Sequence, residues 1–180
     1  MRVCRYADAG SVEIGLFDDT RVVALDVLAK TLGLHAPQPS ADPLAYLPPS
    51  GPSAEAALEL DQRYQALTLS ERAEIARPVQ AVRLLVPVGQ PKKVILLAGN
   101  YAEHITEGGG QAVERERTFP YFFLKPPSTT LTNPGDPVCI PAVSPDHVDW
   151  EVELGVVVGR RCRDVDEADA LECVAGYTIC

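Results

Sequence analysis

Most of what this sequence predicts depends on Asp149-Trp150-Glu151-Val152-Glu153-Leu154 and its apolar continuation, Gly155-Val156-Val157-Val158. Side chains of a β-strand alternate between two faces, so Asp149, Glu151 and Glu153 are expected on one face. The apolar continuation predicts a strand that is buried on both faces. Neighbouring carboxylates on a buried strand repel each other and lose hydration, and a bound cation relieves both effects.

Carboxylate oxygens favour a hard ion such as Mg²⁺, Mn²⁺ or Ca²⁺ over Zn²⁺. The alternative is an edge strand whose acidic side chains are simply solvated. The paired glutamates alone favour the solvated edge strand, and the apolar continuation makes the metal site equally plausible, so the residues leave both interpretations open.

A second candidate site follows the apolar run Lys93–Ala98. Asn100 is expected to cap a short helix from Tyr101 to Glu107, with Glu103 at the third helical position. Three glycines, Gly108-Gly109-Gly110, then end the helix and would let the segment move as a lid.

His104 and Glu107 are three residues apart in this helix and therefore share a face. Glu107 could hold the imidazole in one tautomer, and His104 could then deprotonate a water molecule. The alternative is a surface helix on which the two side chains pair in solvent.

A third candidate is Lys125, which ends the aromatic run Phe119–Leu124. Its ammonium group could reach a carboxylate or enolate oxygen of a substrate. An exposed lysine at the end of a strand is the alternative interpretation.

The chain is expected to have two parts, an N-terminal module (1–77) and the beginning of a β-rich domain (78–180). The module contains a proline-rich stretch (36–53) that predicts a linker or surface loop without regular structure. Strands are expected at Val3–Tyr6, Val12–Phe17, Val22–Leu25, Val82–Val86, Lys93–Ala98, Phe119–Leu124 and Glu151–Gly159, a turn at Asp18-Asp19-Thr20, and helices at Asp26–Leu34 and Ala54–Ala76.

Composition excludes several classes of protein. With 16 basic and 25 acidic residues among 180, the net charge is −9, which argues against binding to nucleic acid or to an anionic membrane surface. No apolar run is long enough to predict a membrane span, and the N-terminus lacks the apolar core of a signal peptide. Five scattered cysteines predict reduced thiols, and hence a cytoplasmic protein.

Four motifs, in order and at fitting spacing, resemble the fumarylacetoacetate hydrolase family. They are Lys93–Tyr101 with His104 and Glu107, then Phe122–Pro126, Asp149–Leu154 and Gly176–Thr178. The resemblance covers roughly residues 82–180, while the first 80 or so resemble the variable N-terminal module of many members only loosely. It implies an α+β, β-rich fold, the mixed β-sandwich roll of this family with a small N-terminal module.

The resemblance also implies divalent-metal-dependent hydrolysis of a C–C bond in a small 2,4-dioxo acid, such as an acylpyruvate or fumarylpyruvate-like intermediate of aromatic-compound catabolism. Glu151 and Glu153 would be ligands of Mg²⁺ or Mn²⁺, and His104 and Glu107 would activate water. Tyr101 and Lys125 would bind the 2-oxo acid substrate, and a homodimer is expected for a complete protein. Alternatives on the same scaffold are a decarboxylase of an oxaloacetate-like substrate or an isomerase of a hydroxymuconate-like one.

In the family, the segment that matches Gly176–Thr178 leads into an Asn-Asp motif whose aspartate is the third metal ligand. This chain stops at Cys180, in mid-strand, so we expect it to be C-terminally truncated relative to the family. A further alternative is therefore an inactive fragment that acts only by association, through open sheet edges and uncovered apolar surface.

Overall fold

The structure is a computed structural model that describes residues 1–111, 117, 119 and 121–180. The chain divides into two compact units, one made of Met1–Gly89 with Thr132–Cys180 and the other of Gln90–Leu131. The expected domain boundary after residue 77 stays a prediction.

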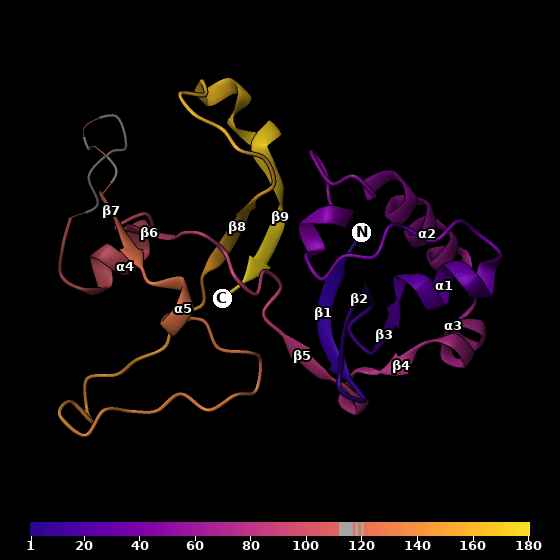
Figure 1. The fold of residues 1–180 in the computed structure, drawn as a ribbon. Helices are drawn as coiled ribbons and strands as arrows, with labels where there is room; N and C mark the ends of the chain where they lie inside the picture. Colours follow the sequence, from indigo (N-terminus) through magenta and orange to yellow (C-terminus); the bar gives the residue numbers. More distant parts are fainter. Residues whose placement is uncertain (112–116, 118, 120) are drawn as a thin grey trace. The chain divides into compact units, whose positions relative to one another are not determined.

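In the described part of the chain, the main sheet of the first unit has five strands in the order β4-β3-β2-β1-β5, and its neighbours run antiparallel (Figure 1). The strands are β1 (Val3–Asp8), β2 (Ser11–Phe17), β3 (Arg21–Ala24), β4 (Arg77–Pro78) and β5 (Arg83–Leu85). The predicted strands in this region are confirmed. β5, from beyond the proline-rich stretch and the helices, pairs with β1.

The predicted turn between β2 and β3 is confirmed at Asp18 and Asp19. The carboxylate of Asp18 accepts hydrogen bonds from the backbone N–H groups of Thr20 (3.2 Å) and Arg21 (2.8 Å). Asp19 adopts a positive φ of 75°, which aspartate tolerates better than most residues.

Helix α1 (Leu25–Leu32) ends at Gly33, whose φ of 65° suits a residue without a Cβ. The single helix expected over Ala54–Ala76 is wrong: α2 (Ala54–Ala66) and α3 (Leu69–Ile75) are separate. The side chain of Thr68 accepts from the N–H of Glu71, and Glu71 bonds back to Thr68, so a capping box starts a new helix there.

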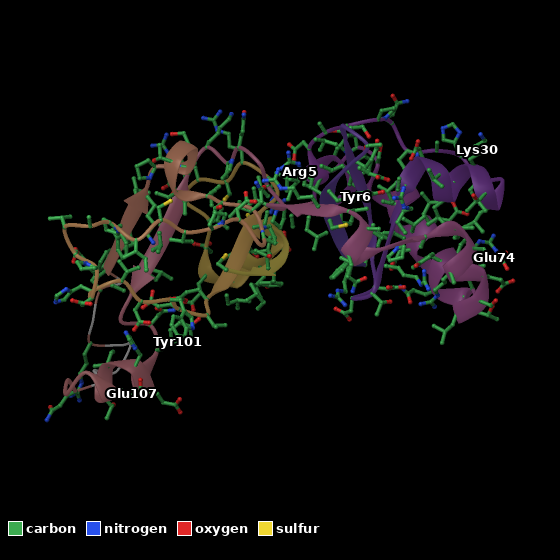
Figure 2. All side chains as sticks on the ribbon, turned by 90° about the horizontal axis from the view of Figure 1, so that it is seen from below. Arg5, Tyr6, Lys30, Glu74, Tyr101 and Glu107 are labelled. Atoms are coloured by element: carbon green, nitrogen blue, oxygen red, sulfur yellow. The ribbon has the colours of Figure 1, made fainter. Side chains whose placement is uncertain are left out.

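The core of this unit follows the alternation of its strands. Leu16 and Val23 face the helices and pack in a cluster with Leu28, Leu60 and Tyr64. The opposite face of the sheet carries the smaller cluster of Tyr6, Val22 and Ala24, and Figure 2 shows Tyr6 beside Arg5 on β1. The module therefore has a conventional core between sheet and helices.

The expectation that residues 36–53 lack regular structure is wrong at η1 (Pro43–Tyr46), a 3₁₀ turn. The side chain of Asp42 caps this turn by accepting from the N–H of Leu44 at 3.0 Å. Tyr46 is only 4% exposed and accepts a hydrogen bond from the N–H of Ser40 at 2.6 Å. The prolines restrict the backbone, but one buried aromatic side chain still fixes the stretch to the core.

Two further antiparallel pairs follow. In the second unit, β6 (Val94–Ala98) pairs with β7 (Tyr121–Lys125), and the short helices α4 (Ala102–Glu107) and α5 (Pro127–Thr130) follow these strands. In the first unit, η2 (Val79–Ala81) precedes β5, and β8 (Leu154–Val158) and β9 (Val174–Ile179) are joined through η4 (Glu167–Cys173). Within the described residues, no helix is long and apolar enough to cross a membrane.

Candidate functional site

The carboxylates of Glu151 and Glu153 lie just before β8, which begins at Leu154 and not, as expected, at Glu151. Glu153 still belongs to the ladder, because its N–H donates to the carbonyl of Cys180 (3.1 Å) and its carbonyl accepts from the N–H of Cys180 (2.9 Å). The exposed Glu151 and Asp149 precede this last pair. The backbone therefore holds Glu153 firmly and leaves Asp149 and Glu151 on an irregular approach to the strand.

The expectation that this strand is buried on both faces is wrong. Leu154, Val156 and Val158 are each more than half exposed, at 55%, 53% and 54%. The physical reason is that β8 has one neighbouring strand, β9, within the described residues. A long run of apolar residues in a strand predicts burial only when other helices or strands are present to cover both faces of that strand.

A close approach between backbone and side chains supports the position of Glu153. A Cβ added to Gly155 would lie 2.8 Å from Cγ2 of Thr178 and 2.9 Å from Sγ of Cys180. Gly155 is opposite Thr178, and Glu153 is opposite Cys180, so these four residues share a face of the pair. The missing side chain at Gly155 leaves room for the side chains of Thr178 and Cys180 on the face that carries Glu153.

Helix α4 carries His104 and Glu107, and Figure 2 shows Tyr101 and Glu107 at its opposite ends. The expected cap at Asn100 is wrong: Tyr101 is the N-cap residue, and its carbonyl accepts from the N–H of Ile105 at 3.2 Å. The amide of Asn100 is therefore one position too early to cap the first turn.

The glycines end α4 as expected. The N–H of Gly108 donates to the carbonyl of His104, and Gly109 has a φ of 78°. A Cβ on Gly110 would lie 2.9 Å from Cγ2 of Ile105, so a larger residue at this position would collide with the Ile105 side chain. His104 and Glu107 are on the outside of this helix, where both side chains are exposed. Their spacing on one helix agrees with a cooperating pair, whose role stays a prediction.

Lys125 lies at the end of β7, opposite Val94. It lines an open hollow of about 220 Å³. The lining residues are Lys92, Lys93, Val94, Leu124, Lys125, Pro126 and Pro127. Lys92 and Lys93 were not predicted as site residues, although two adjacent lysines just before a strand can be recognised in the sequence. Three ammonium groups around an apolar floor suit an anionic organic ligand.

The predicted site residues fall into two groups. His104, Glu107, Tyr101 and Lys125 belong to the second unit, while Glu151 and Glu153 belong to the first. Among the described residues, there is no group of three or more His, Cys, Asp or Glu side chains that could hold a metal ion. The pair Glu151 and Glu153 fits a hard divalent cation in the chemistry of its oxygen donors, and supplies two ligands of the six or more such an ion takes.

Known proteins are similar to this chain in sequence and in fold. Residues 93–180 match the family described as "Fumarylacetoacetate (FAA) hydrolase C-terminal". A relative from Burkholderia lata, provisionally named a hydrolase, is 34% identical over 99% of this chain and 54% of its own length. A protein of Mycobacterium tuberculosis, Rv2993c, is 44% identical over 57% of this chain and 36% of its own length.

Solved structures agree with the sequence matches. Maleylpyruvate hydrolase from Sphingobium sp. SYK-6, in complex with manganese(II) and pyruvate, has a TM-score of 0.62 and 28% identity, over 99% of this chain and 57% of that one. Fumarylacetoacetate hydrolase from Exiguobacterium antarcticum has a TM-score of 0.58 and 25% identity, over 99% of this chain and 54% of that one.

The predicted fold class, an α+β fold of the fumarylacetoacetate hydrolase type, is confirmed by these structures. This chain spans about half of the length of the relatives and structures that it matches throughout. The sequence matches and the fold agree, and the chain belongs to the fumarylacetoacetate hydrolase family.

Proposed function

We propose that this chain takes part in the divalent-metal-dependent hydrolysis of a C–C bond in a small 2,4-dioxo acid of the acylpyruvate or fumarylpyruvate class. The observation that carries the proposal is the pair of carboxylates at Glu151 and Glu153, beside a strand end that two backbone hydrogen bonds fix at Cys180. A structural relative that binds manganese(II) and pyruvate supports the same chemistry.

Glu151 and Glu153 would hold Mg²⁺ or Mn²⁺, since both supply carboxylate oxygens and no softer ligand. When bound, such an ion acts as a Lewis acid toward the oxygens of a 2-oxo acid. Two glutamates leave most of the coordination sphere to other ligands, so metal binding by this chain alone is expected to be weak.

The ladder between β8 and β9 indicates where a further ligand belongs. Glu153 pairs with Cys180, so continuing the antiparallel register brings the second residue after Cys180 opposite Glu151, on the face of the two glutamates. The family resemblance implies an Asn-Asp motif after the segment that matches Gly176–Thr178, and its aspartate would be this further ligand. The register of this chain therefore agrees with a three-carboxylate site in a longer protein.

The residues of the second unit would perform the proton transfer. An imidazole nitrogen of His104 would accept a proton from the attacking water, and the carboxylate of Glu107 would orient the ring and stabilise its charged form. The ammonium group of Lys125, with Lys92 and Lys93 beside it, would bind a carboxylate of the substrate. Tyr101, at the start of α4, would contribute its hydroxyl group to substrate binding.

A decarboxylase acting on an oxaloacetate-like acid and an isomerase acting on a hydroxymuconate-like acid would use the same metal ligands. Turnover of an acylpyruvate compared with oxaloacetate, each with Mn²⁺, separates hydrolysis from decarboxylation. An inactive chain that acts only by association would bind no metal and would form larger oligomers than the homodimer we propose for a complete protein.

The deciding experiment measures Mn²⁺ binding to the chain, with the electron paramagnetic resonance signal of the free ion as the readout. Glu153→Gln and Glu151→Gln are expected to weaken binding at least tenfold, while the matched control Glu74→Gln on α3 leaves it unchanged. Equal Mn²⁺ affinity in all four proteins would refute the metal role of the two glutamates, whatever the activity of the chain.

A further inference from the structure

The sheet of the N-terminal module supplies no residue to the proposed reaction, yet both passages of the chain between its two units are bonded to this sheet. The chain leaves the first unit after Gly89 and returns to it at Thr132. β5, the last strand before the exit, pairs with β1 at the edge of the module's sheet (Figure 1). The turn that follows the return, Asn133–Asp136, is hydrogen-bonded to β5 and to the residue after it. The two passages therefore meet at one edge of this sheet.

Val86, directly after β5, is held at both of its backbone polar groups. Its N–H donates to Oδ1 of Asn133 at 3.1 Å, and its carbonyl accepts from Nη1 of Arg5 on β1 at 2.9 Å. A Cβ on Gly89 would collide with Nη1 of Arg5, so the absence of a side chain there leaves room for the guanidinium group. The exit is thus fixed by one side chain of the module and by one side chain of the returning segment.

The returning segment forms a tight turn. The N–H of Asp136 donates to the carbonyl of Asn133 at 3.0 Å, and Gly135, which follows a proline, has a φ of 80°. Proline and then glycine at the two central positions are typical of a type II turn. Nδ2 of Asn133 donates to Oδ2 of Asp136 at 2.9 Å. This bond orients the amide of Asn133 so that its oxygen faces the N–H of Val86.

Arg83 completes the network from β5. Its Nη2 donates to Oδ1 and to Oδ2 of Asp136, in both cases at 2.8 Å. The hydrogen bond from Arg83, and then the one from Asn133, hold the pKa of Asp136 below its usual value, so the carboxylate is ionised at neutral pH. A partly exposed ion pair contributes little stability by itself. Here, however, the carboxylate also fixes the amide that holds Val86, so the ion pair determines the position of the whole turn.

We propose that Asn133 and Asp136 form a latch, by which the sheet of the N-terminal module holds the base of the second unit. With the latch closed, the connections between the bonded residues and the second unit are short: residues 87–89 at the exit and Thr132 at the return. With the latch open, the two passages move independently, and the second unit gains freedom at its base. The proposal gives the module a role that the proposed function does not supply, and its test needs neither metal nor substrate.

The experiment exchanges the two side chains of the latch. Asn133→Asp places a second carboxylate against Asp136, and the repulsion between the two is expected to open the latch. Combining Asn133→Asp with Asp136→Asn is expected to close it again. In the double variant the carboxylate at position 133 accepts from the N–H of Val86 and from the new amide at position 136, whose oxygen still accepts from Arg83.

Two NMR measurements on the full chain report the state of the latch. Amide hydrogen exchange of Val86 follows its bond to Asn133, and the heteronuclear NOE of Gly89 and Thr132 follows the motion of the two passages. In Asn133→Asp we expect Val86 to exchange about tenfold faster or more, and both NOE values to fall. The double variant should return all three to their native values. The control Asp146→Asn, which removes an exposed carboxylate of the same segment, should leave them unchanged.

Two arginines of the same sheet test the part that the module plays. Arg83 pairs with Asp136 at 2.8 Å, and its side chain is 59% exposed. Arg77 pairs with Asp8 at 2.7 Å, and its side chain is 53% exposed. The two ion pairs are therefore closely matched, but only the first belongs to the latch. Arg83→Gln is expected to lower the NOE of Thr132, whereas Arg77→Gln should not.

Native exchange of Val86 in Asn133→Asp would overturn the proposal, and so would equal motion of Gly89 and Thr132 in the single and the double variant. Amide exchange in the β1–β2 pairing shows for each variant whether the module is folded. Loss of this protection in both the single and the double variant would also overturn the proposal, because the exchanged side chains would then have failed to restore the structure.

Discussion

The hydroxyl group of Tyr64 on α2 donates a hydrogen bond to Oδ2 of Asp18, in the turn between β2 and β3, at 3.0 Å. The ring of Tyr64 is fully buried in the core, with the guanidinium of Arg72 stacked 5.0 Å from its centre. This contact joins the helices of the N-terminal module to its sheet through one polar bond at the edge of the core.

Tyr64→Phe is expected to lower the free energy of unfolding by about 1.5 kcal/mol at neutral pH, because it removes a hydrogen bond to a charged acceptor and leaves the packing intact. Urea denaturation measures this value. In an Asp18→Asn background the same change should have a clearly smaller effect, and an equal effect in both backgrounds would contradict the role of the pair.

The same contact predicts a dependence of stability on pH. Burial raises the pKa of Asp18, but hydrogen bonds from Tyr64, Thr20 and Arg21 outweigh it, so the pKa lies below its usual value. A carboxylate with a lowered pKa in the folded state contributes stability above its unfolded pKa of about 3.9, and this contribution is lost as pH falls through the folded pKa. Burial, followed by Asp18, raises the pKa of Tyr64 to about 12, so the phenol stays a donor throughout this range. We expect Tyr64→Phe to unfold with a shallower acid dependence than the native chain, measured by urea midpoints between neutral and acidic pH.

Two leucines of α2 provide a matched test of the core. Leu60 is 1% exposed and packs in the main cluster, whereas Leu58 is 38% exposed. Leu60→Ala is expected to lower the free energy of unfolding by about 2–5 kcal/mol, and Leu58→Ala by about 0.5 kcal/mol, with little change in helix propensity. Similar losses for the two variants in urea denaturation would show that the N-terminal module does not pack as described.

Two glycines of the β8–β9 pair differ in their surroundings: Gly155 lies at a crowded position and Gly176 at an open one. A methyl group on Gly155 would meet Cγ2 of Thr178 and Sγ of Cys180, whereas one on Gly176 would have no heavy atom within 4 Å in the described residues. Gly155→Ala is expected to destabilise this pair by about 1–3 kcal/mol. Amide hydrogen exchange at Glu153 and Cys180 measures the effect, and faster exchange in Gly176→Ala than in Gly155→Ala would refute the close approach.

Two glutamates on α4 test the proposed proton transfer. Glu103 and Glu107 are both exposed on this short helix, but only Glu107 is proposed to act with His104. In a form of the protein that hydrolyses an acylpyruvate, Glu107→Gln is expected to lower kcat by about 100-fold or more. Glu103→Gln should leave kcat unchanged. If Glu107→Gln has full activity, the dyad is not the base, and the metal-binding experiment still stands by itself.

The sequence predicted correctly the features that depend on a few neighbouring residues. Alternating apolar residues placed β1, β2 and β3, Asp18 placed the turn, and the glycines ended α4, because each depends on the conformational preferences of a few neighbouring residues. Four spaced motifs were enough to indicate the family, because each motif combines several residue types. The signal failed where two local preferences compete: helical composition over Ala54–Ala76 concealed the capping box at Thr68, which starts a second helix.

Contacts between distant segments needed the folded chain. Neither the pairing of β5 with β1 nor the hydrogen bond from Tyr64 to Asp18 can be predicted from the spacing of residues, since both depend on the paths of the segments between them. The exposure of Leu154, Val156 and Val158 likewise depends on which elements cover a strand, and apolar composition alone predicted the opposite. Local chemistry thus determined the helices, the strands and the candidate site residues. Long-range packing determined which of them meet, because burial and pairing are properties of two surfaces and not of one segment.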